Sequence, residues 1–185
     1  MALTPRMACH IGIGLGLIAA PLPAMAQTAN PVPMAESGGA AACSAPVAAT
    51  GVLAPWGAPA PVTAGTVDSA APVLAPGRAV TAALAPTPQV TYPLRPEKPG
   101  GAVSHGGLLA LQIDAAGTYR IALGSPAWID LVRDGQPVIS TAHGHGPDCT
   151  GIRKMVDFPL QPGRYLLQVS ASGAPAVEVL VVRLP

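Results

Sequence analysis

Aromatic side chains, charged side chains and long apolar runs are all scarce in this sequence of 185 residues. Aromatic residues make up 3% of the chain and charged residues 10%, and the formal net charge is +1. A protein that binds nucleic acid or an anionic membrane surface needs a basic patch, and one that binds single strands also needs aromatic stacking platforms. The composition therefore predicts that neither nucleic acid nor a membrane surface is the partner.

The one notable apolar run lies close to the N-terminus. Residues 11–20 are apolar or glycine, they follow Arg6, and Ala24-Met25-Ala26 supplies a small-residue cleavage motif. The run is too short to span a bilayer, which takes roughly 20 apolar residues. We therefore expect residues 1–26 to be a cleaved signal peptide, and the mature chain to be periplasmic or secreted without inserting into the membrane.

Cysteine is also rare, with three residues in the chain. Cys9 is removed with the predicted signal peptide, so Cys43 and Cys149 remain. Two cysteines in an oxidising compartment are expected to form a disulfide. Closing a loop of about a hundred residues is worth roughly 4–5 kcal/mol in the chain-entropy model. The alternative is a redox-active or metal-binding thiol, which the lack of a Cys-x-x-Cys pair makes the weaker interpretation.

Proline and alanine are plentiful in the first part of the predicted mature chain. Residues 27–75 form a Pro/Ala-rich leader and extended segment, of which the first part, up to residue 42, has little to bury. From residue 43 onward the segment carries scattered valines and leucines. We expect this part to lie extended over a core, pinned by Cys43 and Trp56, and its prolines exclude long helices.

Residues 76–185 show a different pattern, in which short apolar or alternating runs are separated by turn signals. Such spacing predicts an all-β domain, a single β-sandwich or jelly roll of seven or eight strands with no helix. The length suits one core. The expected strands are 78–84, 107–113, 118–123, 127–133, 136–142, 152–160, 164–170 and 176–184.

Two of these strands begin in the same way, with a small turn followed by Gly-x-Tyr. The first is in residues 116–121 and the second in residues 162–167. Buried tyrosine hydroxyls usually find a hydrogen-bond partner. We therefore expect Tyr119 and Tyr165 to be corner or core residues whose hydroxyls bind the backbone.

A third motif, Trp-Ile-Asp-Leu-Val-Arg-Asp-Gly in residues 128–135, lies between the two tyrosine turns. Together the three resemble the bacterial pre-peptidase C-terminal domain, over about residues 76–185. The resemblance implies a sandwich fold and an accessory role beside secreted enzymes.

The run Ala-His-Gly-His-Gly-Pro-Asp-Cys-Thr-Gly-Ile-Arg-Lys in residues 142–154 carries a second resemblance. It is similar to small secreted proteins of alphaproteobacteria, some of which bear the name homogentisate 1,2-dioxygenase. Enzymes of that activity are much larger, cupin-fold and iron-dependent. This resemblance implies an alternative function, that of an iron-dependent dioxygenase.

The histidines of this run are the strongest candidates for chemistry. In an extended strand, residues two apart project to the same side, so His143 and His145 can chelate one metal, with Asp148 completing a two-His, one-carboxylate site for iron; copper or zinc are further candidates. His105 is a third ligand only if the fold brings it near. The alternative is a polar glycine-rich loop whose histidines hydrogen-bond locally, with no cofactor.

Two further groups of residues are candidates for binding. Arg153, Lys154 and Arg120 either bind an anionic ligand or are solvated charges on a strand face. Trp128 and Asp130 share a strand face, as in many sugar sites, although a core tryptophan is the commoner role in a sandwich.

These patterns favour an exported, non-enzymatic β-sandwich that binds a small ligand or another envelope protein. The predicted contact surface is the loop from His143 to Lys154, which includes His145, Asp148 and Arg153. The alternative function is a metal-dependent protein, namely a non-haem iron dioxygenase that uses the His-x-His loop.

Overall fold

Strands dominate the part of the chain that the structure, a computed structural model, describes, which is residues 43–185. The predicted signal peptide (1–26) and the leader up to residue 42 lie outside the described residues. The elements are η1 (Gly51–Gly57), β1 (Ala60–Thr63), η2 (Asp68–Ala70), β2 (Val73–Leu74), β3 (Ala79–Ala83), β4 (Ala85–Pro86), η3 (Thr87–Gln89), β5 (His105–Ile113), β6 (Gly117–Leu123), β7 (Trp128–Arg133), β8 (Gln136–Pro137), β9 (Ala142–Gly144), β10 (Lys154–Leu160), β11 (Gly163–Ser172) and β12 (Ala176–Arg183).

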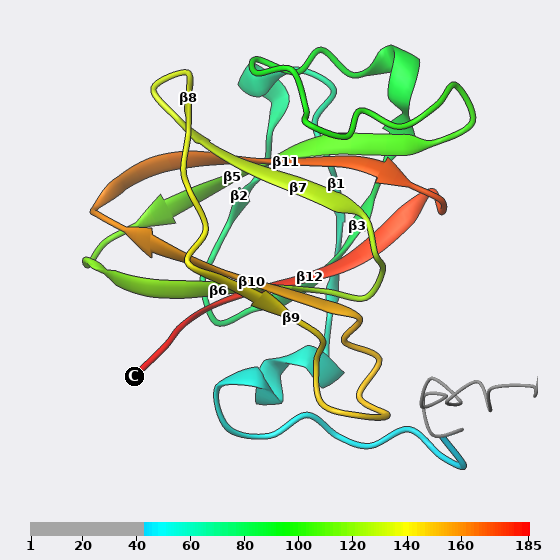
Figure 1. Cartoon of the computed structure of the whole chain (residues 1–185), viewed down its shortest axis with the longest axis vertical. Coiled ribbons are helices and arrows are strands. Elements are labelled where there is room, and N and C mark those ends of the chain that lie inside the picture. Colours follow the sequence, from blue (N-terminus) through cyan, green and yellow to red (C-terminus); the bar gives the residue numbers. More distant parts are fainter. Residues whose placement is uncertain (1–42) are drawn as a thin grey trace, which may run out of the picture. The chain divides into compact units, whose positions relative to one another are not determined.

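The strands form two sheets that pack face to face (Figure 1). Sheet A has the order β1-β3-β12-β6-β10-β9, and sheet B the order β2-β5-β11-β7-β8, with β4 also pairing with β5. This confirms the prediction of an all-β sandwich. Seven of the eight expected strands correspond to β3, β5, β6, β7, β10, β11 and β12.

Alternation of side chains explains the core between the sheets. On β6, Tyr119, Ile121 and Leu123 are buried in the main apolar cluster, and Ile129 and Leu131 on β7 face them from sheet B. Because successive residues of a strand point to opposite faces, one alternating run supplies one wall of the core.

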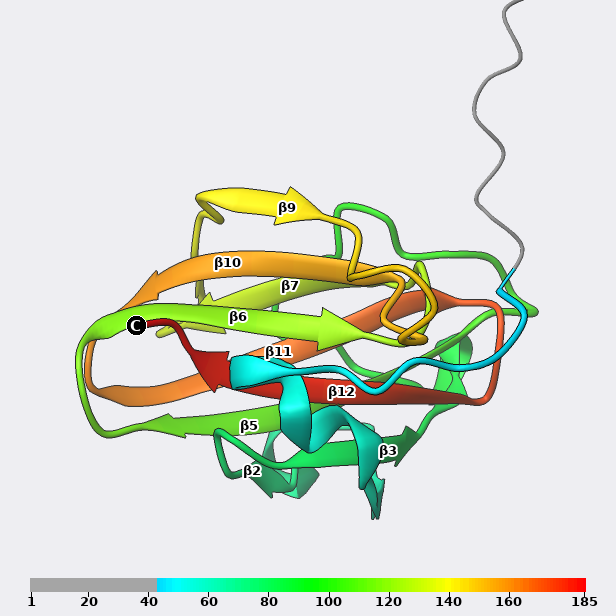
Figure 2. The ribbon, with the colours of Figure 1, turned by 90° about the horizontal axis from the view of Figure 1, so that it is seen from below.

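The outer face of sheet A is covered by the N-terminal part of the described chain (Figure 2). Leu53 and Trp56 of η1 are buried against Leu180 and Val182 of β12 and against Ile152. The predicted anchoring by Trp56 is therefore confirmed, and η1 is a short 3-10 helix inside a segment expected to be extended.

The outer face of sheet B is covered by the proline-rich strap, residues 90–98. Gln168 is fully buried on β11, and its side-chain amide donates to the carbonyl of Leu94 (2.9 Å) and accepts from the Leu94 N–H (3.1 Å). Ser170 donates to the carbonyl of Lys98 (2.8 Å). The strap does not pair with a strand, so these side chains of β11 supply hydrogen-bond partners for its backbone groups. They thereby hold the strap against β11.

The segment from 43 to 75 contributes more than an extended cover. Strand β1 pairs in parallel with β3, and β2 pairs in parallel with β5. Both are outermost strands, where a missing proline N–H, as at Pro61, is tolerated. The expected domain start at residue 76 therefore lies inside the sandwich, because both sheets already have strands before it.

The hairpin signal Asp134-Gly135 is confirmed. The two residues have φ values of 50° and 74°, the positive values that a two-residue turn needs in order to match the twist of its strands.

The returning strand predicted over 136–142 is wrong. β8 ends at Pro137, and after Val138 N–H donates to the carbonyl of Leu131 (2.7 Å) the chain leaves sheet B. It crosses to sheet A, where Thr141 N–H donates to the carbonyl of Asp157 (2.8 Å) and β9 pairs with β10. The backbone of this segment thus finds its partners on two different sheets.

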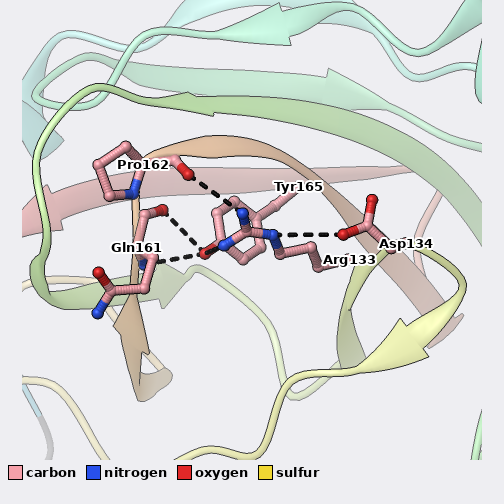
Figure 3. A network of polar contacts seen from close by, with 5 residues as sticks. All are labelled: Arg133, Asp134, Gln161, Pro162 and Tyr165. Atoms are coloured by element: carbon pink, nitrogen blue, oxygen red, sulfur yellow. Dashed lines mark hydrogen bonds and ion pairs between the residues drawn. The ribbon is translucent and has the colours of Figure 1, made fainter.

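The two Gly-x-Tyr turns fold alike, as predicted. Tyr119 donates to the carbonyl of Ala115, four residues before it, and Tyr165 donates to the carbonyl of Gln161, both at 2.9 Å. Tyr165 also accepts bonds from the Gln161 N–H and from Arg133 (Figure 3). Each hydroxyl closes the turn that leads into its own strand.

A disulfide joins Cys43 to Cys149, with their Cα atoms 5.5 Å apart and a sequence separation of 106. The predicted pairing is confirmed. Val47 N–H donates to the carbonyl of Cys149 (2.8 Å), so the backbone follows the crosslink. A disulfide of this kind is compatible with an extracellular or periplasmic protein. In residues 43–185 there is no helix of the length and apolar character needed to cross a membrane.

Candidate functional site

A cavity of about 470 Å³ opens between the two sheets at one side of the sandwich. Its walls come from β7 and β8 of sheet B, from β9 and β10 of sheet A, and from the crossing between β8 and β9. Figure 1 shows this crossing passing from one sheet to the other. The cavity therefore lies along the open edges of the sandwich, within reach of solvent.

The short pairing of β8 explains why space is left there. β8 pairs with β7 only through Val132 and Arg133. The earlier half of β7, from Trp128 to Asp130, has no β8 residue beside it, and the chain that would have continued β8 forms the far wall instead. A full-length returning strand would have filled this edge.

The floor of the cavity is apolar. Leu131, Val156 and Phe158 belong to the main core and are almost fully buried, and Val138 packs against them. Ile139 also lines the cavity but is 75% exposed. A bound apolar group would bury the exposed side chain of Ile139 together with the apolar floor, and removing this apolar surface from water favours binding.

Trp128 forms the centre of a polar cluster on the β7 side. Its indole N–H donates to Oδ1 of Asp130 (3.0 Å). The ammonium groups of Lys98, from the strap, and Lys154, from β10, lie 4.6 Å and 4.8 Å from the centre of the ring. The prediction that Trp128 and Asp130 share a face is confirmed. The expected core role is wrong: Ile129 and Leu131 face the core, so Trp128 lies on the opposite face of β7, where it is half-buried.

Asp130 is held in an unfavourable environment for a carboxylate. Burial raises its pKa above the ordinary value, and the hydrogen bond from Trp128 and the charge of Lys154 lower it only in part. The backbone of Glu97 also lowers the pKa, and Oδ2 is buried without a hydrogen bond from residues 43–185. Burial, with a contribution from the charge of Asp130, raises the pKa of Tyr92 to about 12.

Lys154 is the counterpart of Asp130 on the opposite sheet. Its ammonium donates to the carbonyl of Ala127 (3.0 Å), which ties β10 to the start of β7. Burial, followed by the like charge of Lys98, lowers the pKa of Lys154, and Asp130 partly offsets this. The lysine therefore bridges the two walls of the cavity.

The two histidines of the predicted loop line the cavity, His143 from β9 and His145 from the residue that follows it. His143 pairs with Val156, and directly opposite residues project to the same face, so its ring faces the cavity side with the buried valine. The Nδ1 atom of His145 lies 3.1 Å from the carbonyl of Arg153. A carbonyl oxygen only accepts, so Nδ1 carries the hydrogen and closes the base of the loop.

Arg153 lines the cavity beside these histidines. Its backbone N–H donates to the carbonyl of Leu123 (2.8 Å), which fixes the residue at the end of β6. Within residues 43–185 its guanidinium takes part in none of the three ion pairs and donates no hydrogen bond. It is an unpaired cation at the rim.

Four of the predicted contact residues thus meet in one place: His143, His145, Arg153 and Lys154. Asp148 does not line the cavity and is exposed on the far part of the loop. His105 is also elsewhere, at the start of β5, where its Nδ1 atom is buried with no hydrogen-bond partner among residues 43–185.

The predicted metal set is not assembled in the described part of the chain. Residues 43–185 contain no group of three or more His, Cys, Asp or Glu side chains placed to hold a metal ion. The separation of Asp148 and His105 from the cavity accounts for this.

Arg120 is not available to bind an anion, because it makes a bidentate ion pair with Asp157 (2.7 and 2.8 Å) that raises the pKa of Arg120.

Sequence reasoning missed the apolar lining of the cavity and the contribution of the strap. Glu97 comes from the strap, which was not expected at the site, and Val138 comes from the segment predicted to be a strand. The one available signal was the proline at 137, which interrupts a run otherwise suited to a strand.

No family model matches this chain, and no curated protein matches it. The resemblance to the pre-peptidase C-terminal domain, and that to the proteins named homogentisate 1,2-dioxygenase, therefore stay predictions.

Proposed function

We propose that the chain is an exported, non-enzymatic binding module, and that the cavity between β7–β8 and β9–β10 takes a small molecule with an apolar body. The observation that carries this proposal is the meeting of the predicted loop residues His143, His145, Arg153 and Lys154 with Trp128 at one cavity. Export is expected from the predicted signal peptide, residues 1–26, and agrees with the disulfide.

The shape and lining of the cavity support a small ligand. Sites for small molecules usually have volumes of about 300–1,000 Å³, with mostly apolar walls and a few placed polar groups, and this cavity has about 470 Å³. Leu131, Val156 and Phe158 provide the apolar floor, and the charged groups stand around it. A protein partner would be expected to bind a flatter surface than this cavity.

A neutral fluorescent probe tests this proposal. N-phenyl-1-naphthylamine brightens when it enters an apolar cavity, and we expect saturable binding to the purified mature protein. Val138→Trp and Ser140→Trp each place bulk in the cavity and should reduce binding. Val73→Trp is the matched control, since Val73 is exposed on β2 at the opposite edge of sheet B.

Two outcomes would contradict the proposal. One is that no saturable binding occurs, or that the probe binds equally well to both cavity-filling variants while thermal unfolding shows them folded. The other is stoichiometric iron, copper or zinc in the purified protein that disappears in the His143→Ala/His145→Ala variant, because a metal held there would make the protein metal-dependent.

A further inference from the structure

The charges around the cavity do not cancel. Glu97 and Asp130 bring two carboxylates, whereas Arg153 and Lys154 in the lining and Lys98 over Trp128 bring three cations. The two carboxylates and the two lysines gather around Trp128, where the opposite charges offset one another. The surplus positive charge is therefore that of Arg153.

The position of Arg153 makes this surplus available to a ligand. Its backbone is fixed by the bonds to Leu123 and His145, so the side chain starts from a defined point on the rim. Within the described residues no carboxylate pairs with it. A guanidinium presents donors in a planar fork that matches the two oxygens of a carboxylate.

The neighbours of Arg153 add polar groups of the same kind. His143 faces the cavity, and His145 has its Nδ1 atom committed to Arg153, which leaves Nε2 without a partner among residues 43–185. Imidazoles become cationic donors when protonated. Opposite this polar rim lies the apolar floor of Leu131 and Phe158.

We propose that the ligand is a small monocarboxylate with an apolar body. The carboxylate binds to the guanidinium of Arg153 beside His143 and His145, and the apolar body lies on the floor of the cavity. This inference rests on the proposed function, since it names the chemical class that the same cavity selects.

Displacement of the neutral probe by a matched series tests the charge preference. Octanoate, octan-1-ol and octylamine share one apolar chain and carry a negative, a neutral and a positive head at pH 7. A charge-assisted pair with Arg153 should let octanoate displace the probe at a concentration about 10-fold below that of octanol. Octylammonium should be the weakest of the three.

Substitution of the arginine locates the effect. In Arg153→Gln the advantage of octanoate over octanol should fall to about 2-fold or less, because the amide carries no charge to pair with the carboxylate. Arg78→Gln is the matched control, because Arg78 is exposed before β3, at the opposite side of the sandwich, and should leave the 10-fold advantage in place.

The outcomes separate the two proposals. If the probe does not bind, the cavity is not a ligand site and the proposed function fails. If the probe binds but octanoate displaces it no better than octanol, or octylamine displaces it best, the anion assignment alone is overturned. An advantage of octanoate that survives in Arg153→Gln would also overturn it, because the selectivity would then come from other charges.

Discussion

The hydroxyl of Tyr165 is fully used. It donates to the carbonyl of Gln161 and accepts from the Gln161 N–H and from Arg133, each at 2.9 Å (Figure 3). Tyr119 occupies the equivalent turn but makes one bond, to Ala115. We expect Tyr165→Phe to lower the free energy of unfolding by about 2–3 kcal/mol and Tyr119→Phe by about 1 kcal/mol. Urea unfolding of both variants measures the difference, and equal losses would show that the extra bonds of Tyr165 add nothing.

Asp130 gives a second prediction at this scale, about pH. Because its pKa is raised in the folded protein, the folded state holds the proton more tightly than the unfolded chain. The stability linked to that proton is complete below the unfolded pKa and is lost as the pH rises through the folded one. Asp130→Asn keeps an oxygen that accepts from Trp128 and removes the charge.

We therefore expect Asp130→Asn to be more stable than the parent at pH 7, and the difference to vanish toward about pH 3. The gain should stay below about 1 kcal/mol, since a half-exposed carboxylate is screened by solvent. Denaturant unfolding at both pH values measures it. Asp114→Asn, at an exposed aspartate, is the control. A variant less stable than the parent at pH 7 would mean that the charge of Asp130 stabilises the fold.

At the scale of the element, one buried amide, that of Gln168, makes two of the hydrogen bonds that hold the strap on sheet B. Gln168→Leu would keep the volume on β11 but leave the N–H and carbonyl of Leu94 without partners. We expect a loss of about 2–3 kcal/mol in the free energy of unfolding. Amide exchange in residues 90–98 should be faster in the variant than in the parent, while exchange in the core strands changes less. Gln112→Leu, at an exposed glutamine on β5, is the control, and unchanged exchange in the strap would refute the role of Gln168.

The long strands were within reach of sequence reasoning, and the short ones were not. Strand β6 could be predicted from the alternation of Tyr119, Ile121 and Leu123 with more polar residues, because that pattern depends only on local geometry. β1 and β8 are short and contain Pro61 and Pro137, and their pairing depends on neighbours far away in sequence. The error at 136–142 arose because alternation cannot tell on which sheet a strand will pair.

The candidate site shows the same division. The loop residues His143, His145, Arg153 and Lys154 were found because their chemistry is visible in the sequence. The cavity itself was not, since it exists where β8 stops early and the strap brings Glu97 beside Trp128. Those are consequences of the packing of two sheets, and no local pattern encodes them.

At the scale of the whole molecule, the disulfide links the start of the described chain to the loop that borders the cavity. Cys149 lies between His145 and Arg153, so the crosslink could act on stability, on the site, or on both. The base of the loop is closed independently of it, by the bond from His145 to the carbonyl of Arg153 and by the burial of Ile152 against Trp56.

Stability and binding should therefore respond differently when the crosslink is removed. We expect Cys43→Ser/Cys149→Ser to lower the free energy of unfolding by about 2–4 kcal/mol, because the unfolded chain regains the freedom of a long loop. The affinity for the neutral probe should change by less than about 2-fold, since the cavity walls keep their own contacts. Thermal unfolding and probe titration of the same sample measure both. If affinity fell with stability, the crosslink, and not the contacts of Ile152 and His145, would be what shapes the rim of the cavity.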